Sequence, residues 1–142
     1  MNLLINTDGG ARGNPGPAGI GIVVREEAGQ ELYEHAEAIG ETTNNVAEYK
    51  ALEHAVDWLT AYEDLNLVEQ VTFRLDSKLV IEQVQGNWKI KQPHLLPLVN
   101  YIQSQIAALP CSVSFTYVPR IENAAADALV NQALDAAMDE AK

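Results

Sequence analysis

The sequence predicts an α/β fold, a mixed sheet with helices on its faces, and three observations support this. Three strand-like segments follow one another early in the chain with short connections, as in an antiparallel meander. Two later strand-like segments each follow a helical segment, so they are expected to join the sheet in parallel through crossovers. With 142 residues, 47% of them apolar, the chain has the size and composition of one folded domain.

The first part of the chain contains the segments that would form the antiparallel strands. Residues 2–8 begin with an apolar run and predict a strand. Residues 9–19 hold five glycines and two prolines, and this composition predicts a loop. Residues 20–26 predict a second strand, and residues 31–40, in which apolar and polar side chains alternate, predict a weaker third strand.

Helical spacing begins after the third strand. Apolar side chains recur every three or four residues over 42–65 and predict an amphipathic helix of roughly twenty residues. Val71, Phe73 and Leu75 alternate with polar side chains, as in a half-buried strand. The later segments predict a helix over 77–85, a break over 86–93, a helix over 95–109, a strand over 111–119 and an alanine-rich helix over 123–141 with Asn123 as its N-cap.

Composition narrows the class of protein. No apolar run approaches the roughly 18 residues that a membrane helix requires, and the N-terminus has no basic segment of the kind that begins a signal peptide. The single cysteine, Cys111, excludes an internal disulfide and a multi-cysteine metal site. We therefore expect a single cytoplasmic domain over residues 1–142 that binds no membrane, is monomeric and needs no obligate protein partner.

The charge balance argues against one class of partner. There are 9 Lys and Arg residues against 20 Asp and Glu, which gives a net charge of −11. Non-specific binding to nucleic acid depends on lysine and arginine neutralising phosphates, so an acidic chain is expected to repel nucleic acid. Divalent cations held by carboxylates would reverse the sign of the charge locally, so composition leaves both outcomes open.

Four acidic residues lie at the ends of predicted elements. Asp8 and Asp76 each end a strand, whereas Glu48 and Asp127 lie in the first turns of helices. Each has a purely structural interpretation as well. These are an Asx turn at Asp8, a capping box of Asn45 with Glu48, a helix N-cap at Asp76 and a favourable charge at a helix N-terminus for Asp127.

Taken together, the four acids indicate a metal site. Adjacent parallel strands end at the same edge of a sheet, where ligands collect, and helices that begin there can add side chains to the same point. Clustered carboxylates repel one another unless cations neutralise them, and hard oxygen ligands select Mg²⁺ or Mn²⁺. A pair of such ions favours an in-line displacement at phosphorus.

Four strings of the sequence resemble the ribonuclease H type 1 family. They are TDGGARGNPGPAGIG, TTNNVAEYKAL, LDSKLVIEQVQGNWK and PRIENAAADALVNQALD, in that family's order, and the resemblance covers residues 2–138. It implies a ribonuclease H-like fold, with three antiparallel and then two parallel strands in a five-stranded sheet flanked by helices on both faces. It also implies endonucleolytic cleavage of the RNA strand of an RNA/DNA hybrid, leaving 5′-phosphate and 3′-hydroxyl ends.

The resemblance implies roles for the four carboxylates, which correspond to the family's metal ligands. Asp8 would contact both of two Mg²⁺ ions, for which Mn²⁺ could substitute. Glu48 and Asp76 would hold the ion near the leaving group, and Glu48 would also lie near the RNA 2′-hydroxyl. Asp127 would help to hold the ion that activates the attacking water.

Residues at the glycine-rich segment and the long helix would contact the nucleic acid. Gly9 and Gly10 carry no side chain, so the backbone could approach the minor groove, where the 2′-hydroxyl distinguishes RNA from DNA. The family places Asn14 and Asn45 against the nucleic acid and Thr43 at a DNA-strand phosphate. Asn14 could equally be a turn residue, and the other two could be helix caps.

A basic segment would line a channel for the DNA strand. Trp88, flanked by Lys89 and Lys91, lies where family members bind DNA, although it could instead anchor the break in the core. Arg12 and Lys78 also fall in the matched strings. These basic residues, with Arg120, would form a local positive path on an acidic protein.

The chain departs from many family members in two respects. Residues 118–127 contain no histidine, where many members carry a mobile one, so Arg120 becomes a candidate phosphate or leaving-group contact, or else a surface cation near Glu122. The basic helical protrusion is also missing, which with the net charge predicts modest affinity and a steep metal requirement. The histidines, which are interpreted as structural or surface residues, are His35, His54 and His94.

Two further functions compete with hydrolysis of a hybrid. The first is a catalytically weak or inactive module of the same fold that binds hybrid or double-stranded RNA. The presence of all four carboxylates argues against it, because a module that only binds has little reason to keep a repulsive cluster. The second is a nucleotide-binding enzyme, but the glycine-rich segment matches neither G-x-G-x-x-G after a strand nor G-x-x-x-x-G-K-[ST].

Overall fold

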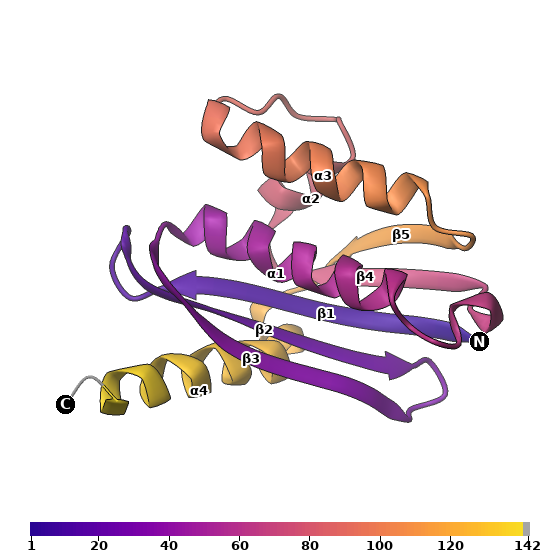
Figure 1. Ribbon diagram of the computed structural model, residues 1–142, viewed down its shortest axis with the longest axis horizontal. Coiled ribbons are helices and arrows are strands. Elements are labelled where there is room, and N and C mark those ends of the chain that lie inside the picture. The colour runs from indigo at the N-terminus through magenta and orange to yellow at the C-terminus, as the bar shows by residue number, and fades with distance from the viewer. Residues whose placement is uncertain (141–142) are drawn as a thin grey trace.

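A five-stranded mixed sheet forms the centre of the protein. The computed structural model describes residues 1–140. The order across the sheet is β3-β2-β1-β4-β5; β2 is antiparallel to β1 and β3, whereas β4 is parallel to β1 and β5. The predicted fold class is therefore confirmed (Figure 1). The strands are β1 (Asn2–Ala11), β2 (Gly16–Glu26), β3 (Glu31–Thr42), β4 (Gln70–Leu75) and β5 (Ser112–Tyr117).

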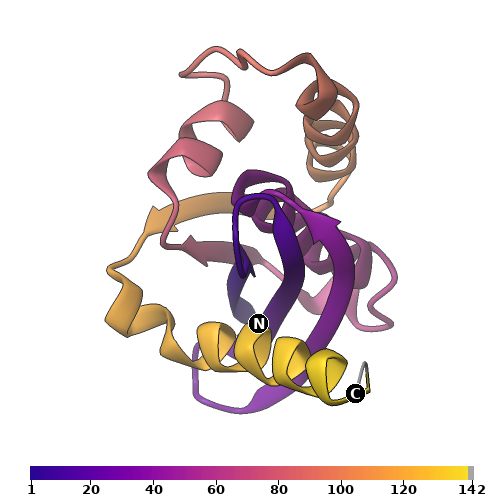
Figure 2. The ribbon, with the colours of Figure 1, turned by 90° about the vertical axis from the view of Figure 1, so that its left-hand side faces the viewer.

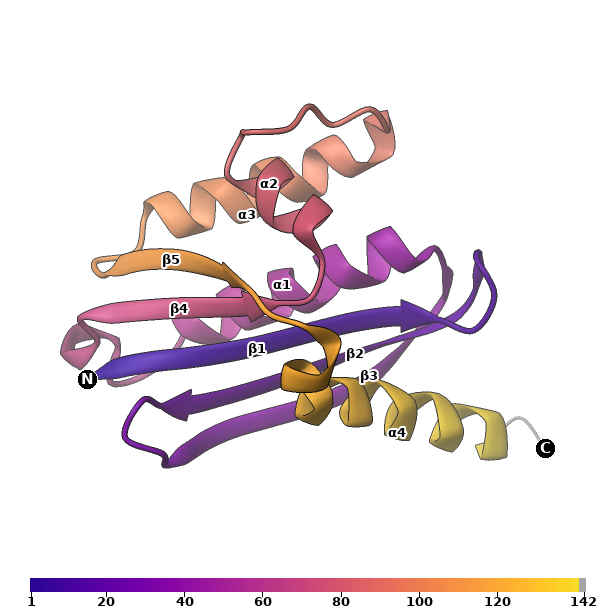
Figure 3. The same ribbon diagram turned by 180° about the vertical axis from the view of Figure 1, so that it is seen from behind.

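Helices cover both faces of this sheet. Helix α4 (Ala124–Glu140) packs on β2 and β3 on one face, and α1 (Asn44–Thr60) packs on β1 and β2 on the other. Beyond α1 lie α3 (Leu96–Ala107), which packs against it, and the short α2 (Lys78–Val84), which packs near β5. Figure 2 shows α4 and the group of α1, α2 and α3 on opposite sides of the strands, and Figure 3 shows α4 from behind.

Apolar residues from the sheet and α1 form the main core. Alternation in β4 places Val71, Phe73 and Leu75 in the interior, as their spacing predicts. The buried face of α1 is wider than the spacing of its large apolar residues predicts, because alanines are also buried where the helix contacts the sheet. The buried residues of this helix are Ala47, Tyr49, Ala51, Leu52, Ala55, Val56 and Leu59. Within residues 1–140, no helix is long and apolar enough to cross a membrane.

The predicted loop over residues 9–19 is wrong at both ends. β1 continues through Gly9 and Gly10 to Ala11, and β2 already begins at Gly16. Gly9 pairs with Ile20 and Gly10 with Gly19, so the antiparallel ladder holds backbone that its composition assigns to a loop. Composition records local preference, whereas the pairing that decides here is with another strand.

Of the predicted helix caps, Thr43 is confirmed, whereas Asn45 and Asn123 are wrong. The N-cap of α1 is Thr43, whose hydroxyl accepts a hydrogen bond from the Val46 N–H. Asn123 does not cap the last helix. It lies in a short 3₁₀ turn (Arg120–Asn123), and its buried side chain bonds Asn6 and the Thr7 carbonyl oxygen in β1. Residue 141, the predicted end of this helix, lies outside the described residues.

Two glycines let the flanking helices approach the sheet closely beside Asp8. A Cβ on Gly9 would lie 2.2 Å from the carbonyl oxygen of Ala47 in α1. A Cβ on Gly21, the cross-strand partner of Asp8, would lie 2.2 Å from the carbonyl oxygen of Ala126 in α4. Both approaches are possible only without a side chain.

Replacing Gly9 by alanine should therefore destabilise the protein. The new methyl group would collide with backbone, which can move only if α1 shifts, so we expect a loss of about 3 kcal/mol in the free energy of unfolding. Gly10→Ala is the matched control, because the nearest atoms to its Cβ lie 3.9 Å and 4.0 Å away. Urea unfolding of both variants at one temperature makes the comparison, and equal stabilities would contradict the close packing.

Candidate active site

The four predicted carboxylates lie together in one cleft. Asp8, Glu48, Asp76 and Asp127 all line a cleft of about 480 Å³ at the ends of β1 and β4 and the beginning of α4. Asp8 lies inside β1 and is only 9% exposed. Asp76 follows the last residue of β4, and Asp127 lies in the first turn of α4.

The close helix–sheet contacts bring these side chains together. Glu48 follows Ala47, whose carbonyl oxygen touches Gly9, and Gly9 follows Asp8. On the other face, Asp127 follows Ala126, whose carbonyl oxygen touches Gly21 beside Asp8. The acids on the two helices are thus held next to Asp8 by backbone packing rather than by attraction between charges.

Three of the structural interpretations of these acids do not hold. Asp8 continues a strand instead of forming a turn. Because Thr43 is the N-cap of α1, Asn45 and Glu48 do not form a capping box. The N-cap of α2 is Ser77, not Asp76. Asp127 does lie in the first turn of α4, where its charge is favourable.

Burial and mutual repulsion raise the pKa of Asp8 to about 8. Burial is the largest cause, followed by the negative charges of Asp76 and Asp127, a hydrogen bond with Asp127 and then the charge of Glu48. Burial likewise raises the pKa of Glu48 to about 7, with a smaller contribution from Asp76, and a hydrogen bond from Ser77 opposes this. At neutral pH the cluster therefore retains protons that a bound cation could replace.

Asp76 lies in a more balanced environment. Burial raises the pKa of Asp76 as well, but a hydrogen bond from Asn123 and the positive charge of Arg120 lower it. Arg120 is 81% exposed at its side chain, and its guanidinium lies 3.6 Å from the Asp127 carboxylate. Glu122, the alternative partner of Arg120, instead lies 4.0 Å from Arg74.

The donor set fits hard divalent cations. Every charged ligand in the cleft is a carboxylate oxygen, and the groups that bond those carboxylates, Ser77 and Asn123, are neutral hydroxyl and amide donors. Oxygen ligands of this kind suit Mg²⁺ and Mn²⁺. Among the residues that the structure describes, no basic side chain lowers the pKa of Asp8 or Glu48 to offset burial and the neighbouring carboxylates.

A second cleft, of about 500 Å³, collects most of the predicted DNA-binding residues. It is lined by Asn45, Trp88, Lys89 and Lys91, among others. Trp88 is 44% exposed, so it does not anchor the core. The ammonium group of Lys78 lies 6.0 Å from the centroid of the Trp88 ring, at cation–π distance.

The beginning of α1 lies between the two clefts. Asn44 lines the first cleft, and its neighbour Asn45 lines the second. The Asn14 side chain accepts a hydrogen bond from the Asn44 N–H, and the Asn44 side chain accepts one from the Ala11 N–H. Thr43 caps the helix, so its hydroxyl already has a structural partner. These bonds hold the β1–β2 connection against α1.

The remaining basic and glycine residues of the first cleft also have contacts within the protein. Arg12 lines the first cleft, but its guanidinium also lies 2.7 Å from the Asp135 carboxylate of α4. The missing side chain of Gly9 allows close packing of α1, and Gly9 also lines the first cleft. Gly10 lines the first cleft and keeps it open there.

Some polar residues of the site are not among those predicted from the sequence. Asn44 and Asn131 line the cleft, and Asn131 bonds the Asp127 carbonyl oxygen. Its spacing of four residues from Asp127 on one helix face was a usable signal. Ser77 and Asn123 act on Glu48 and Asp76, but these contacts arise only from tertiary packing. Tyr117, 56% exposed at the end of β5, also borders the cleft.

The strand order together with the carboxylate cleft defines an α/β protein of the ribonuclease H-like fold. The family profile described as "Reverse transcriptase-like" matches residues 6–133. By this match, and by the relatives described next, the chain belongs to the ribonuclease H type 1 family.

Three relatives illustrate the similarity. The bifunctional protein Rv2228c of Mycobacterium tuberculosis is 45% identical over 99% of this chain, which spans 38% of that protein's length. LC11-RNase H1, isolated from compost by a metagenomic approach and solved in complex with RNA/DNA hybrid, is 46% identical, with a TM-score of 0.90 over 96% of this chain and 99% of the other. RNase H1 of the halophilic archaeon Halobacterium salinarum is 36% identical, with a TM-score of 0.87 over 95% and 98% of the two chains.

Stability without metal should fall as the pH rises. Asp8, with a pKa raised from 3.8 to about 8, keeps a proton in the folded protein that the unfolded chain releases. Its contribution is therefore fully present below about pH 4 and is lost as the pH rises through 8. Thermal unfolding in chelator from pH 5 to 8.5 should show a smaller decline for Asp8→Asn than for the native protein.

Glu63→Gln is the control for this measurement. It also removes one carboxylate, but Glu63 is exposed and lies outside the cleft. It should keep the native pH dependence. Added Mg²⁺ should stabilise the native protein most at high pH, where the carboxylates are ionised. Parallel pH profiles for the native protein and Asp8→Asn would contradict the raised pKa of Asp8.

Proposed function

We propose that the protein is a metal-dependent ribonuclease H that cleaves the RNA strand of RNA/DNA hybrids and leaves 5′-phosphate and 3′-hydroxyl ends. The observation that carries this proposal is the convergence of Asp8, Glu48, Asp76 and Asp127 in one cleft of a chain of this family. The complex of LC11-RNase H1 with RNA/DNA hybrid supports the choice of substrate.

Asp8, Glu48, Asp76 and Asp127 would hold two Mg²⁺ ions, or Mn²⁺ in their place, when substrate is bound. Such ions supply positive charge for an in-line displacement at phosphorus. The chain's own contribution is orientation. Ser77 and Asn123 hydrogen-bond Glu48 and Asp76, respectively, and so fix the direction of their carboxylates.

Arg120 would act on the phosphate. Its side chain is exposed at the mouth of the cleft and lies near Asp127, so the guanidinium can turn toward a bound phosphate without losing a buried partner. Arginine donates two parallel hydrogen bonds to phosphate oxygens. In this proposal Arg120 occupies the place that a histidine fills in many family members.

The second cleft would bind the DNA strand. Trp88 offers an exposed ring on which a base or sugar could stack, and Lys78, Lys89 and Lys91 bring positive charge to the same place. Asn45 on this side and Asn44 on the other would contact the two strands from the beginning of α1. A local basic path of this kind allows a chain with a net charge of −11 to bind nucleic acid.

The proposal extends to a monomer that acts in the cytoplasm. Double-stranded RNA is a second candidate substrate, since its minor groove also displays 2′-hydroxyls. Thr43 and Asn14 would contribute mainly by positioning the beginning of α1, because both already bond its backbone. Arg12 would reach phosphate only by leaving Asp135.

Cleavage by Asp8→Asn tests the proposed role of the carboxylates. We expect the rate on labelled RNA/DNA hybrid in Mg²⁺ to fall at least about 100-fold, because a charged ligand at the centre of the cluster becomes a neutral amide. Hybrid, RNA duplex and DNA duplex of one sequence should be compared in Mg²⁺, Mn²⁺ and chelator. Glu63→Gln should cleave like the native protein.

Native protein that binds hybrid but yields no products with either metal would instead support a binding module. Retained Mg²⁺-dependent cleavage by Asp8→Asn would refute the proposed metal site. Products that carry 3′-phosphate ends would refute the proposed direction of the displacement.

Arg120→Ala should slow turnover only in part. We expect kcat to fall about tenfold, or about 1.4 kcal/mol, because one phosphate contact is lost while the carboxylate cluster remains. Arg25→Ala, on β2 opposite Leu4 and away from the cleft, is the matched control. An unchanged kcat for Arg120→Ala on hybrid and on double-stranded RNA would make Arg120 a surface cation.

A further inference from the structure

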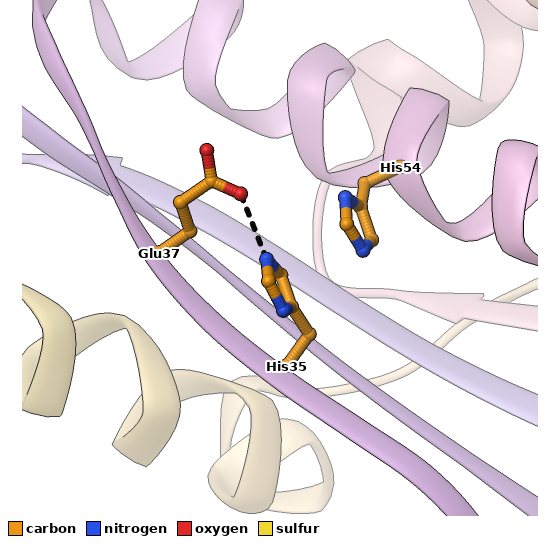
Figure 4. A group of neighbouring side chains, drawn as sticks. All are labelled: His35, Glu37 and His54. Atoms are coloured by element: carbon orange, nitrogen blue, oxygen red, sulfur yellow. Dashed lines mark hydrogen bonds and ion pairs between the residues drawn. The ribbon is translucent and has the colours of Figure 1, made fainter.

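A second group of metal-type ligands lies outside the carboxylate cleft. His35 and Glu37 on β3 and His54 on α1 each offer one ligand atom, and these three atoms all lie within 4.8 Å of one another. Figure 4 shows the two imidazole rings facing each other between the strand and the helix, with Glu37 reaching toward His35. In the sequence, His35 lies on a predicted strand and His54 in the middle of the predicted helix that follows, so no local motif indicates the group.

The fold brings these residues together for a simple reason. Side chains two residues apart on a strand point to the same face, so Tyr33, His35 and Glu37 share the face of β3 that meets α1. There Tyr33 stacks on Trp58 with ring centroids 5.3 Å apart, and His35 stacks on His54 at 4.0 Å. β3 is also an edge strand of the sheet.

The geometry points to a binding site for one late first-row divalent cation, and we propose that His35, Glu37 and His54 bind Zn²⁺ or a cation of similar preference. Two imidazoles and one carboxylate are a ligand set that zinc accepts, with water in the fourth position. Imidazole ligands favour zinc, copper or nickel, whereas Mg²⁺ prefers oxygen ligands alone. The bound ion would fasten the edge strand β3 to α1.

Hydrogen bonding and charge around His54 support this assignment. The Tyr33 hydroxyl lies 2.9 Å from Nε2 of His54. When Nε2 carries the proton and donates it to that hydroxyl oxygen, Nδ1 keeps a free lone pair for a metal. The carboxylate of Glu37, which lies close to both rings, adds a negatively charged ligand.

The site must close when the ion binds. Tetrahedral zinc holds its ligand atoms about 3.4 Å apart, because each bond to nitrogen or oxygen is about 2.1 Å long. The rings of His35 and His54 are almost parallel, with 6° between their planes, so one ring must turn for both lone pairs to reach one ion. Glu37, 49% exposed at its side chain, has room to follow. The ion would replace the contact of 2.7 Å between His35 Nε2 and Glu37 Oε1.

Nuclear magnetic resonance of the histidine rings with Zn²⁺ alone tests the proposal on the whole chain. Excess Mg²⁺ occupies the carboxylate cleft during the titration, and uniform ¹⁵N labelling reports each ring nitrogen separately. We expect one equivalent of Zn²⁺ to shift ring nitrogens of His35 and His54 and to leave those of His94 unchanged. The midpoint of thermal unfolding should rise with Zn²⁺, since the ion binds the folded state.

Variants separate this site from the carboxylate cleft. His35→Gln and Glu37→Gln should each weaken Zn²⁺ binding at least about tenfold, because each removes one of three ligands. His54→Gln should weaken Zn²⁺ binding as well, but His54 lies on α1 and this variant could fail to fold. His35 and Glu37 are on the edge strand β3, so their variants still test the site in that case. His94→Gln, which changes the remaining histidine, and Asp8→Asn, which changes the catalytic cleft, should both bind Zn²⁺ like the native protein.

Two outcomes would overturn the proposal. Equal Zn²⁺ affinity in the native protein, His35→Gln and Glu37→Gln would show that His35 and Glu37 form only an ion pair. Loss of binding in Asp8→Asn would place the Zn²⁺ in the carboxylate cleft. Because Zn²⁺ binding is measured without nuclease activity, failure of this proposal and failure of the proposed function can be told apart.

Discussion

The structure depends on holding four carboxyl groups close together in one partly buried cleft. The fold does this through backbone contact at two glycines. Gly9 lets α1 approach β1 until Glu48 lies beside Asp8, and Gly21 lets α4 approach β2 until Asp127 does the same. The repulsion among the acids is then opposed by packing of the whole core. A divalent cation bound among these carboxylates would lower their mutual repulsion.

The same constraint explains the distribution of the other charges. The protein supplies little positive charge to the cluster, since Arg120 is exposed and Arg12 bonds Asp135. Lys89 and Lys91 instead line the second cleft, and Lys78 lies over the ring of Trp88. In the proposed function, one cleft would attract cations and the neighbouring cleft would attract a polyanion, with the beginning of α1 between them. An acidic chain can in this way bind nucleic acid over a restricted surface.

Much of the fold could be predicted because its signals are local. Alternation at Val71, Phe73 and Leu75 and helical spacing around Tyr49 gave the right elements, and strand connections gave the mixed sheet. The errors occur where long-range contacts override local preference. Gly10 belongs to a strand because Gly19 pairs with it. Asn123 turns from the expected cap to bond β1.

The two sites show the same difference between local signals, which the sequence reveals, and long-range contacts, which it does not. The four carboxylates could be identified from the sequence, although Asp8 lies inside β1 rather than at its end. The residues that orient them, Ser77 and Asn123, could not be identified. The group of His35, Glu37 and His54 was missed, because interpretation as surface residues considers each side chain alone. Only the packing of an edge strand on a helix brings them within reach of one ion.

Anomalous scattering from crystals grown with Mn²⁺ tests the central claim most directly. Data collected near the manganese absorption edge should show a peak bonded to the Asp8 carboxylate, with Glu48, Asp76 or Asp127 as further ligands. Strong peaks elsewhere and none within about 2.5 Å of these four side chains would contradict the account, because the cluster would then carry its repulsion without serving as a cation site.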